Sequence, residues 1–200
     1  MKNIYYFLVF LCAFSLNAQD NPLINFPSLS PDGKTIAFNY QGDIWTASVN
    51  GEILNRITIH EAYDTNPLWS PDGKTIIFQS NRFGNYDVFT IPFEGGIPLR
   101  ITFHSANDRV SDITLNGDII FETSRNFVQV EREPEIYKVS LKGGTPFRFL
   151  NALGFNATVS PNGKLVAFTK GSCRIEREAY QGPANRDIWV YNIDNDTYHQ

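Results

Sequence analysis

The chain has 200 residues, of which 42% are apolar and 14% aromatic, and its formal net charge is −4. This composition agrees with a soluble β protein, and no linker-like or low-complexity stretch divides the chain. The negative charge provides no electrostatic basis for binding nucleic acid or an anionic membrane, so neither is expected as a partner.

The first 18 residues have the three-part layout of a signal peptide. Lys2 supplies a positive charge, an apolar run covers residues 4–16, and the small residue Ala18 precedes a polar segment. The run is too short for a comfortable membrane span, which makes an uncleaved anchor the weaker alternative. We expect cleavage after Ala18 and export to the periplasm, with secretion from the cell as the alternative, and no membrane association afterwards.

The two cysteines do not indicate a disulfide-stabilised domain. Cys12 lies inside the apolar run without a small residue before it, which argues against a lipoprotein anchor. Cleavage after Ala18 leaves only Cys173, and a single cysteine forms no internal disulfide.

Four copies of a short motif follow the signal peptide. The segment Ser-Pro-Asp-Gly-Lys-Thr-Ile-Ala-Phe at residues 30–38 returns almost unchanged at 70–78, and weaker copies occupy 114–121 and 160–168. The turn glycines are consequently 40, 44 and 46 residues apart: Gly33, Gly73, Gly117 and Gly163. A period of about 40–45 residues with turn signals is typical of propeller blades, and no long stretch has helical periodicity.

The second copy shows how one repeat forms a four-stranded blade. Residues 67–70 are predicted to be a first strand, and residues 71–73 a tight turn in which proline presets φ and glycine accepts a positive φ. The remaining strands are predicted at residues 74–79, 86–91 and 98–102. The last of these is an outer strand, where an edge position tolerates proline.

The sequence thus predicts an all-β fold, a β-propeller with four four-stranded blades of which the last is incomplete. The expected blades are about residues 23–60, 61–104, 105–150 and 151–200, in one propeller domain covering residues 19–200. Propellers close into rings of about 4–8 blades, and the fourth outer strand only begins at residues 198–200. We therefore expect the chain to be the N-terminal part of a longer protein.

Because a single blade cannot bury both of its faces, stacking of neighbouring blades is expected to form the core. The predicted core residues are Ile36, Phe38, Trp45, Ile76, Phe78, Phe89, Phe121, Tyr137, Phe168 and Trp189.

The usual catalytic signatures are missing: the chain has no Gly-x-Ser-x-Gly elbow, His-Glu-x-x-His motif, phosphate-binding loop or Cys-x-x-Cys pair. His60 and His104 occupy matching positions in two repeats, each four residues before an aspartate. A catalytic residue is normally needed once, so repetition favours a role in bracing loops over catalysis or metal binding. We predict no catalytic, cofactor or metal site.

The acidic residues that open each third strand also recur in register: Asp43, Asp87, Glu135 and Asp187. Repetition again favours a structural role. Arg82 and Arg125 stand in matching loops, and we hypothesise that they pair with Asp87 and Glu135, respectively, to hold those loops.

Function is expected where the repeat is broken, because loops carry specificity on a rigid scaffold. The loop after the third repeat's second strand is enlarged to about residues 123–134, and its counterpart in the fourth repeat covers about 171–186. Both should lie at the same end of the propeller as the His-x-x-x-Asp loops. This end is the candidate interaction surface, unless the loops are merely tolerated insertions. The candidate residues are Phe127, Glu131, Arg132, Glu133, Arg174, Arg177 and Tyr180.

Three motifs resemble the propeller repeats of TolB and of tricorn-type proteases. They are the Ser-Pro-Asp-Gly-Lys copies, Gly-Gly-x-Pro-x-Arg-Ile-Thr at 95–102, and Asn-Arg-Phe-Gly-Asn-Tyr-Asp-Val at 81–88. The finer resemblance is to the N-terminal propeller of exported bacterial tricorn-like proteases of the S41 peptidase class. It rests on the array starting straight after the signal peptide, on residues 102–108, and on the long loop ending at residues 180–189.

This resemblance implies a non-catalytic propeller that guides or filters peptides toward a serine-protease domain outside this chain. The implied partners are peptides or unfolded polypeptides and the parent's own downstream domains, and the parent could form a homo-oligomer. No cofactor is implied. A TolB-like periplasmic propeller that only binds proteins is the first alternative. An exported oligopeptidase of the α/β-hydrolase type is the second.

Overall fold

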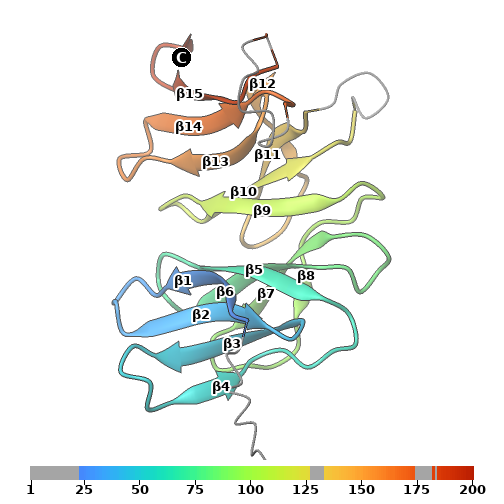
Figure 1. Cartoon of the computed structure of the whole chain (residues 1–200), viewed down its shortest axis with the longest axis vertical. Helices are drawn as coiled ribbons and strands as arrows, with labels where there is room; N and C mark the ends of the chain where they lie inside the picture. Colours follow the sequence, from blue (N-terminus) through green and yellow to red (C-terminus); the bar gives the residue numbers. More distant parts are fainter. Residues whose placement is uncertain (1–22, 127–132, 174–181, 183) are drawn as a thin grey trace, which may run out of the picture.

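The computed structural model describes residues 23–126, 133–173, 182 and 184–200. Throughout this described part the regular elements are β-strands, and they form four antiparallel sheets of four strands each. In each sheet the strands lie side by side in chain order, and the sheets follow one another as blades of a propeller (Figure 1). The predicted all-β propeller of four-stranded blades is confirmed.

The strands have the following bounds. Blade 1 contains β1 (Asn25–Leu29), β2 (Thr35–Tyr40), β3 (Asp43–Ser48) and β4 (Leu54–Arg56). Blade 2 contains β5 (Asp64–Trp69), β6 (Thr75–Ser80), β7 (Asp87–Pro92) and β8 (Leu99–Arg100). Blade 3 contains β9 (Asp108–Ile113), β10 (Asp118–Thr123), β11 (Glu135–Ser140) and β12 (Phe147–Leu153). Blade 4 contains β13 (Phe155–Val159), β14 (Leu165–Lys170), β15 (Asp187–Asn192) and β16 (Thr197–His199).

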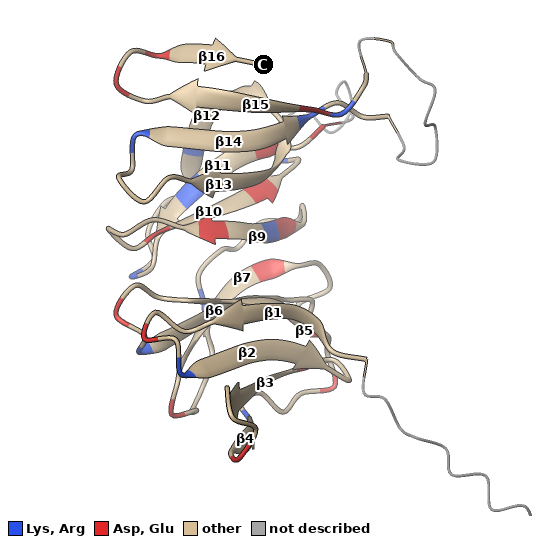
Figure 2. Cartoon of the chain, turned by 60° about the vertical axis from the view of Figure 1, so that its left-hand side comes forward, with Lys and Arg blue, Asp and Glu red and all other residues tan. Residues whose placement is uncertain are grey.

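Blade 4 also has an outer strand, although the sequence suggested only its beginning. β16 pairs with β15 through Val190–His199, Tyr191–Tyr198 and Asn192–Thr197. The four blades are stacked in order, with blade 1 and blade 4 at opposite ends of the array (Figure 1). Charged residues gather at strand ends and turns, whereas β2, β6 and β14 are uncharged along most of their length (Figure 2).

The Ser-Pro-Asp-Gly repeat recurs because it builds the same turn between the first and second strands. In blade 1 the Ser30 hydroxyl donates a hydrogen bond to Asp32 (2.6 Å), and Asp32 accepts another from the Lys34 amide (3.1 Å). These donors lower the pKa of Asp32. Gly33 has φ of 71°, in the left-handed region where glycine is strongly favoured. The 70–78 copy reproduces the same hydrogen bonds.

Three apolar clusters lie between successive blades, as blade stacking predicts. Seven of the ten predicted core residues are buried: Phe38, Ile76, Phe78, Phe89, Phe121, Tyr137 and Phe168. Ile36, Trp45 and Trp189 are only half-buried. Ile36 and Trp45 lie on the face of blade 1 opposite Ala37 and Ile44, which pack in the cluster shared with blade 2. Trp189 packs at the border of the third cluster.

The hypothesised Arg82–Asp87 ion pair is wrong. Arg82 instead donates to both carboxylate oxygens of Asp64, at 2.9 and 2.8 Å. Ser80, at the end of β6, lies opposite Asp64 on β5 and Asp87 on β7, so the following loop can reach either acid. Asp87 is already bound by Arg100 from the outer strand (2.7 Å). Arg82 therefore pairs with the inner strand.

Blade 3 repeats this arrangement, and the hypothesised Arg125–Glu135 pair is wrong for the same reason. Arg125 pairs with Asp108 of the inner strand at 2.5 Å, while Arg148 of the outer strand lies 3.7 Å from Glu135. Each acid that opens β3, β7 or β11 therefore faces an arginine from its own outer strand: Asp43–Arg56, Asp87–Arg100 and Glu135–Arg148. These three acids have the structural role that their repetition predicted. The fourth recurring acid, Asp187, instead accepts a hydrogen bond from Asn185 (3.4 Å).

Side chains from one blade also bond the inner-strand backbone of the next. Asn39 of β2 donates to the carbonyl oxygen of Asp64 (2.5 Å), and Gln79 of β6 accepts from the Val110 amide (2.9 Å). Asn66 of β5 donates to the Val110 carbonyl (2.5 Å), so both backbone groups of Val110 are bound by blade 2. These amide bridges fix the spacing of the inner strands.

Carboxylates replace the amides at the junction of blades 3 and 4. Glu122 of β10 accepts hydrogen bonds from the Asn156 amide and from the Ser111 hydroxyl. Asp112 of β9 accepts from the Val159 amide at 2.7 Å. Burial raises the pKa of Glu122, although these donors and the nearby Arg109 oppose the increase. This junction therefore keeps a carboxylate that is costly to ionise.

Removal of the Arg82 side chain should destabilise the array. Asp64 is fully buried, so Arg82→Ala leaves an uncompensated buried charge, and we expect a loss of roughly 3 kcal/mol in the free energy of unfolding. Urea titration monitored by tryptophan fluorescence measures the change. The control is Lys164→Ala, which breaks the exposed Lys164–Asp194 pair and should lower stability far less, because exposed ion pairs contribute little. Equal effects of the two variants would contradict the structural role of the buried pair.

Glu122→Gln should raise stability at neutral pH. The pKa of Glu122 is higher in the folded chain than in the unfolded chain, so its stabilising contribution is complete at low pH and is lost as pH rises through the folded pKa. Glutamine keeps the acceptor, as Gln79 does at the matching position of blade 2. We expect the variant to melt above the wild type at pH 8, with the difference shrinking toward pH 4. The exposed control Glu52→Gln should show no such trend, and a pH-independent difference for Glu122→Gln would be inconsistent with this assignment.

Candidate functional site

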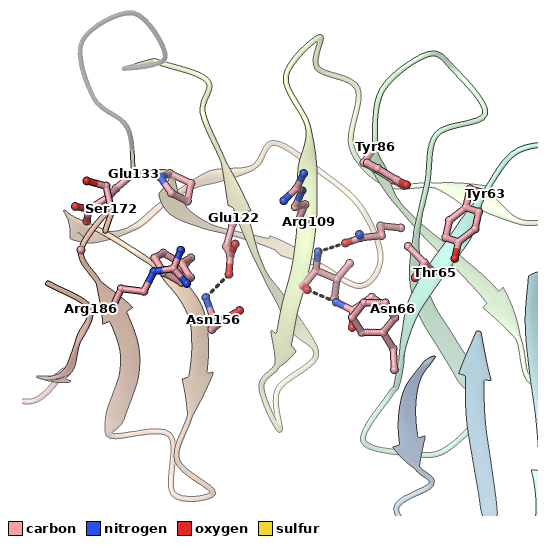
Figure 3. Close-up of a pocket in the computed structure, with 16 residues that line it drawn as sticks. Tyr63, Thr65, Asn66, Tyr86, Arg109, Glu122, Glu133, Asn156, Ser172 and Arg186 are labelled. Carbon is pink, nitrogen blue, oxygen red and sulfur yellow. Dashed lines mark hydrogen bonds between the residues drawn. The ribbon is translucent and has the colours of Figure 1, made fainter. Parts of the chain in front are cut away.

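A cavity of about 750 Å³ opens along the inner strands of the blades, at the end that carries the loops between second and third strands (Figure 3). Inner strands, second strands and the loops before the third strands all contribute to it. Its lining residues are Phe26, Tyr63, Thr65, Asn66, Gln79, Tyr86, Arg109, Val110, Glu122, Glu133, Pro134, Phe155, Asn156, Gly171, Ser172 and Arg186.

Bulges in the inner strands shape this wall. The pairing of first and second strands shifts register within residues 25–28, 65–68 and 155–158. At these bulges Phe26, Asn66 and Asn156 have left-handed backbones, with φ between 51° and 54°. A bulge redirects side chains near functional surfaces, and asparagine tolerates this conformation better than most residues. The bulge at Asn66 places its amide within 2.5 Å of the Val110 carbonyl.

The wall between blades 2 and 3 is polar and rigid. Thr65 is 4% exposed, and its hydroxyl has no hydrogen-bond partner. Gln79 is 8% exposed and is fixed by its bond to the Val110 amide. Tyr86 enters from the loop before β7, where its amide bonds Asn107 (2.9 Å). Figure 3 shows Thr65 and Tyr86 on the blade 2 side and Arg109 on the neighbouring strand, β9.

The wall between blades 3 and 4 carries charges of both signs. Glu122 is held by its bonds to Ser111 and Asn156, and one oxygen of Glu133 is buried without a hydrogen-bond partner. The guanidinium of Arg186 lies over the Phe155 ring, 5.0 Å from its centre. The described lining can therefore supply hydrogen bonds, charge and aromatic contact to a bound molecule.

Of the seven candidate residues predicted from the sequence, the structure places Glu133 in the wall of this cavity. The other six lie outside the described residues: Phe127, Glu131, Arg132, Arg174, Arg177 and Tyr180. Arg186, at the end of the fourth repeat's long loop, also lines the cavity. The involvement of the two enlarged loops in binding remains a prediction.

The sequence analysis missed the inner-strand part of the cavity. A usable signal existed, because core positions repeat from blade to blade whereas some wall positions do not. Strand pairing aligns Thr65, Arg109 and Phe155 as equivalent inner-strand positions, and all three line the cavity. Three chemically different residues at one position of a strong repeat indicate that this position serves something other than the common fold.

The two repeated histidines brace loops. The Nδ1 atom of His60 accepts a hydrogen bond from the Ala62 amide (2.9 Å), and His104 does the same with Ala106 (3.0 Å). Neither histidine lines the cavity. Within the described ranges, no group of three or more His, Cys, Asp or Glu residues is arranged to hold a metal ion.

The predicted signal peptide, residues 1–18, lies outside the described residues. No helix among the residues that the structure describes is long and apolar enough to cross a membrane.

The chain is similar in sequence to a tricorn protease homolog and to a TolB protein, among other relatives. Over 98 residues it is 31% identical to tricorn protease homolog 1 of Streptomyces coelicolor, which covers 48% of this chain and 9% of the relative. Over 169 residues it is 30% identical to the Tol-Pal system protein TolB of Francisella tularensis subsp. mediasiatica, which covers 80% of this chain and 38% of the relative. The chain therefore spans much less than two thirds of either relative.

Solved structures share the propeller fold. The tricorn protease superposes with a TM-score of 0.72 at 17% identity, covering 89% of this chain and 18% of that chain. The putative TolB from Agrobacterium tumefaciens gives a TM-score of 0.71 at 19% identity, covering 90% of this chain and 61% of that chain. At these identities the likeness shows the fold alone.

The family model described as the tricorn protease N-terminal beta propeller domain matches residues 21–200, which include all four blades. The resemblance inferred from the repeats is thereby confirmed at the level of the family. This chain belongs to the family of tricorn protease N-terminal β-propeller domains.

Proposed function

We propose that this chain is the non-catalytic propeller segment of an exported tricorn-like serine protease of the S41 peptidase class. In this proposal it guides or filters peptides and unfolded polypeptides toward a protease domain elsewhere in the parent protein. Export to the periplasm rests on the predicted signal peptide. The family match over residues 21–200 and the similarity to a tricorn protease homolog support the choice of parent.

The cavity along the inner strands is the observation that carries the binding role. Its wall combines two tyrosines, two phenylalanines, hydrogen-bonding side chains and charges of both signs. A polypeptide of mixed sequence presents matching groups at every residue. The cavity is open and its lining residues come from all four blades, which suits a segment of extended chain better than a compact small molecule.

The backbone of the wall limits the ways in which a peptide can bind to it. Asp64, Val110 and Asn156 use inner-strand backbone groups to bond side chains of the preceding blade. These groups are unavailable for adding a peptide as a further β-strand, a mode in which main-chain bonds provide the affinity. Side chains must then contact the peptide. Such contacts are replaced easily as a chain moves, which is what a guiding surface requires.

A TolB-like propeller that binds proteins without serving a protease is the second candidate. It is favoured by the 30% identity to TolB over 169 residues and by the TolB structural match. An oligopeptidase of the α/β-hydrolase type is a weaker candidate. The supporting match is a puromycin-hydrolyzing peptidase from Mycobacterium tuberculosis, with a TM-score of 0.65 at 12% identity, which shows the fold alone.

The proposal predicts binding without hydrolysis. We expect the chain to bind fluorescently labelled casein, an unfolded polypeptide, in an anisotropy assay, and to release no cleavage products from it. The full-length parent should cleave the same substrate. Phe155→Ala should weaken binding, because it removes the large apolar contact area that an aromatic side chain supplies.

The exposed Phe147→Ala change, on the outer strand of blade 3, is the matched control and should leave casein binding unchanged. Hydrolysis by this chain alone would contradict the non-catalytic role. Equal loss of binding in both phenylalanine variants would contradict the cavity as the binding surface. A parent that binds casein but never cleaves it would favour the TolB-like candidate.

A further inference from the structure

The wall between blades 2 and 3 carries uncharged polar side chains on one face of blade 2. Thr65 of β5 pairs with Gln79 of β6, so their side chains lie on the same face of the sheet. That face packs against blade 3, because Gln79 accepts a hydrogen bond from the Val110 amide. Tyr86 lines the same side of the cavity (Figure 3).

The charged side chains that line the described part of the cavity belong to the other junction. Arg109 pairs with Glu122, whose carboxylate bonds the Asn156 amide of blade 4, so both side chains face blade 4. Glu133 and Arg186 lie on the blade 3 and blade 4 side (Figure 3). The wall between blades 2 and 3 therefore offers a ligand hydrogen bonds without charge.

The bridges to Val110 leave one free donor group and one free acceptor. The Oε1 atom of Gln79 is occupied by the Val110 amide, which leaves the NH₂ group of Gln79 free. Nδ2 of Asn66 donates to the Val110 carbonyl, which leaves Oδ1 of Asn66 free. A backbone N–H requires an oxygen and a carbonyl requires an N–H, so these partners determine the orientation of both amides. The free donor and the free acceptor are thus held in place by the same residue.

Two hydroxyl groups accompany them. Thr65 is 4% exposed and lines the cavity, and its hydroxyl has no hydrogen-bond partner. A buried hydroxyl without a partner lowers stability, and valine would fit the same space without that loss. The Tyr86 hydroxyl forms no hydrogen bond with the residues that the structure describes. Because a hydroxyl both donates and accepts, either group can complete the contacts of a ligand.

We propose that the wall between blades 2 and 3 is a subsite for the primary amide of an Asn or Gln side chain in a bound peptide. The amide oxygen accepts from the NH₂ group of Gln79, and the amide NH₂ group donates to Oδ1 of Asn66. The hydroxyls of Thr65 and Tyr86 supply further hydrogen bonds. This subsite deepens the proposed peptide-binding function and rests on it.

The hydrogen-bonding inventory favours an amide over other side chains. A carboxylate has no donor for Oδ1 of Asn66, and an ammonium group has no acceptor for the NH₂ group of Gln79. An apolar side chain leaves both groups unpaired, and a site with unpaired polar groups rejects such a ligand. Gln79 is only 8% exposed, so a side chain that projects from an extended peptide reaches it more readily than the peptide main chain.

Isothermal titration calorimetry of the whole chain with three matched peptides tests the subsite. All three are short, acetylated and amidated, and they differ only in a central Gln, Glu or Met. Glu has the shape of Gln with a charge, and Met has a similar length without an amide. The Gln peptide should bind at least about tenfold more tightly than either of the others.

Gln79→Glu tests the donor while keeping the bridge between blades. Glu122 at the equivalent position of blade 3 accepts from a backbone amide of the next blade, so glutamate can support this contact. The substitution replaces the free NH₂ donor with an oxygen, and the preference for Gln over Met should be lost. The matched control is Asn116→Asp, the same chemical change in the exposed turn before β10, where the first repeat has Asp32. It should leave the preference unchanged.

Thr65→Val gives a second test that does not touch the bridge. It should weaken binding of the Gln peptide several-fold while leaving the melting temperature unchanged or higher, because it removes an unpaired buried hydroxyl. A threonine with a structural role only would leave the affinity for the Gln peptide unchanged.

The outcomes separate this inference from the proposed function. If unfolded casein and all three peptides bind and the peptides have equal affinities, the amide subsite is wrong while the guiding role stands. If the Gln peptide is preferred but Gln79→Glu and Asn116→Asp reduce that preference equally, the subsite is also wrong, because its location does not matter. If neither casein nor any peptide binds, the proposed function fails, and this inference fails with it.

Discussion

Every blade of this protein has two faces to bury, and only a neighbouring blade can bury them. The three apolar clusters lie between successive blades, so burial in one sheet depends on the position of the next. The inner strand of each blade adds a second requirement, because its free edge exposes backbone groups that need partners. Side chains from the preceding blade meet that requirement at Asp64, Val110 and Asn156.

This requirement also shapes the candidate site. The cavity wall is made of the same inner strands, and its backbone groups are bound before a ligand arrives. What remains for a ligand is the set of side chains that the bridges leave free, such as the Thr65 hydroxyl and the Arg109 guanidinium. The bridging position varies from Asn39 to Gln79 to Glu122, so each junction presents different chemistry to the cavity while the stacking geometry is kept.

The sequence predicted the fold well because its determinants are local. The Ser30–Asp32–Gly33 turn is closed by hydrogen bonds within six residues. Each copy of this turn therefore indicates a first strand before it and a second strand after it. Contacts between elements were harder to predict. Asp64 and Asp87 flank Ser80 symmetrically, so spacing alone could not assign Arg82 to one of them. The choice depends on Arg100, which reaches Asp87 from the outer strand.

The candidate site was predicted only in part, because the enlarged loops break the repeat visibly in the sequence and the inner wall does not. Glu133 is the predicted residue that the structure places in the cavity, and Thr65 and Arg109 become visible only when strand pairing aligns the blades. A crystal structure of the chain with a short bound peptide tests the central claim most directly. The account predicts that the peptide lies along the inner strands, in contact with the side chains that line the cavity. A peptide bound at the outer strands, with the inner wall empty, would contradict it.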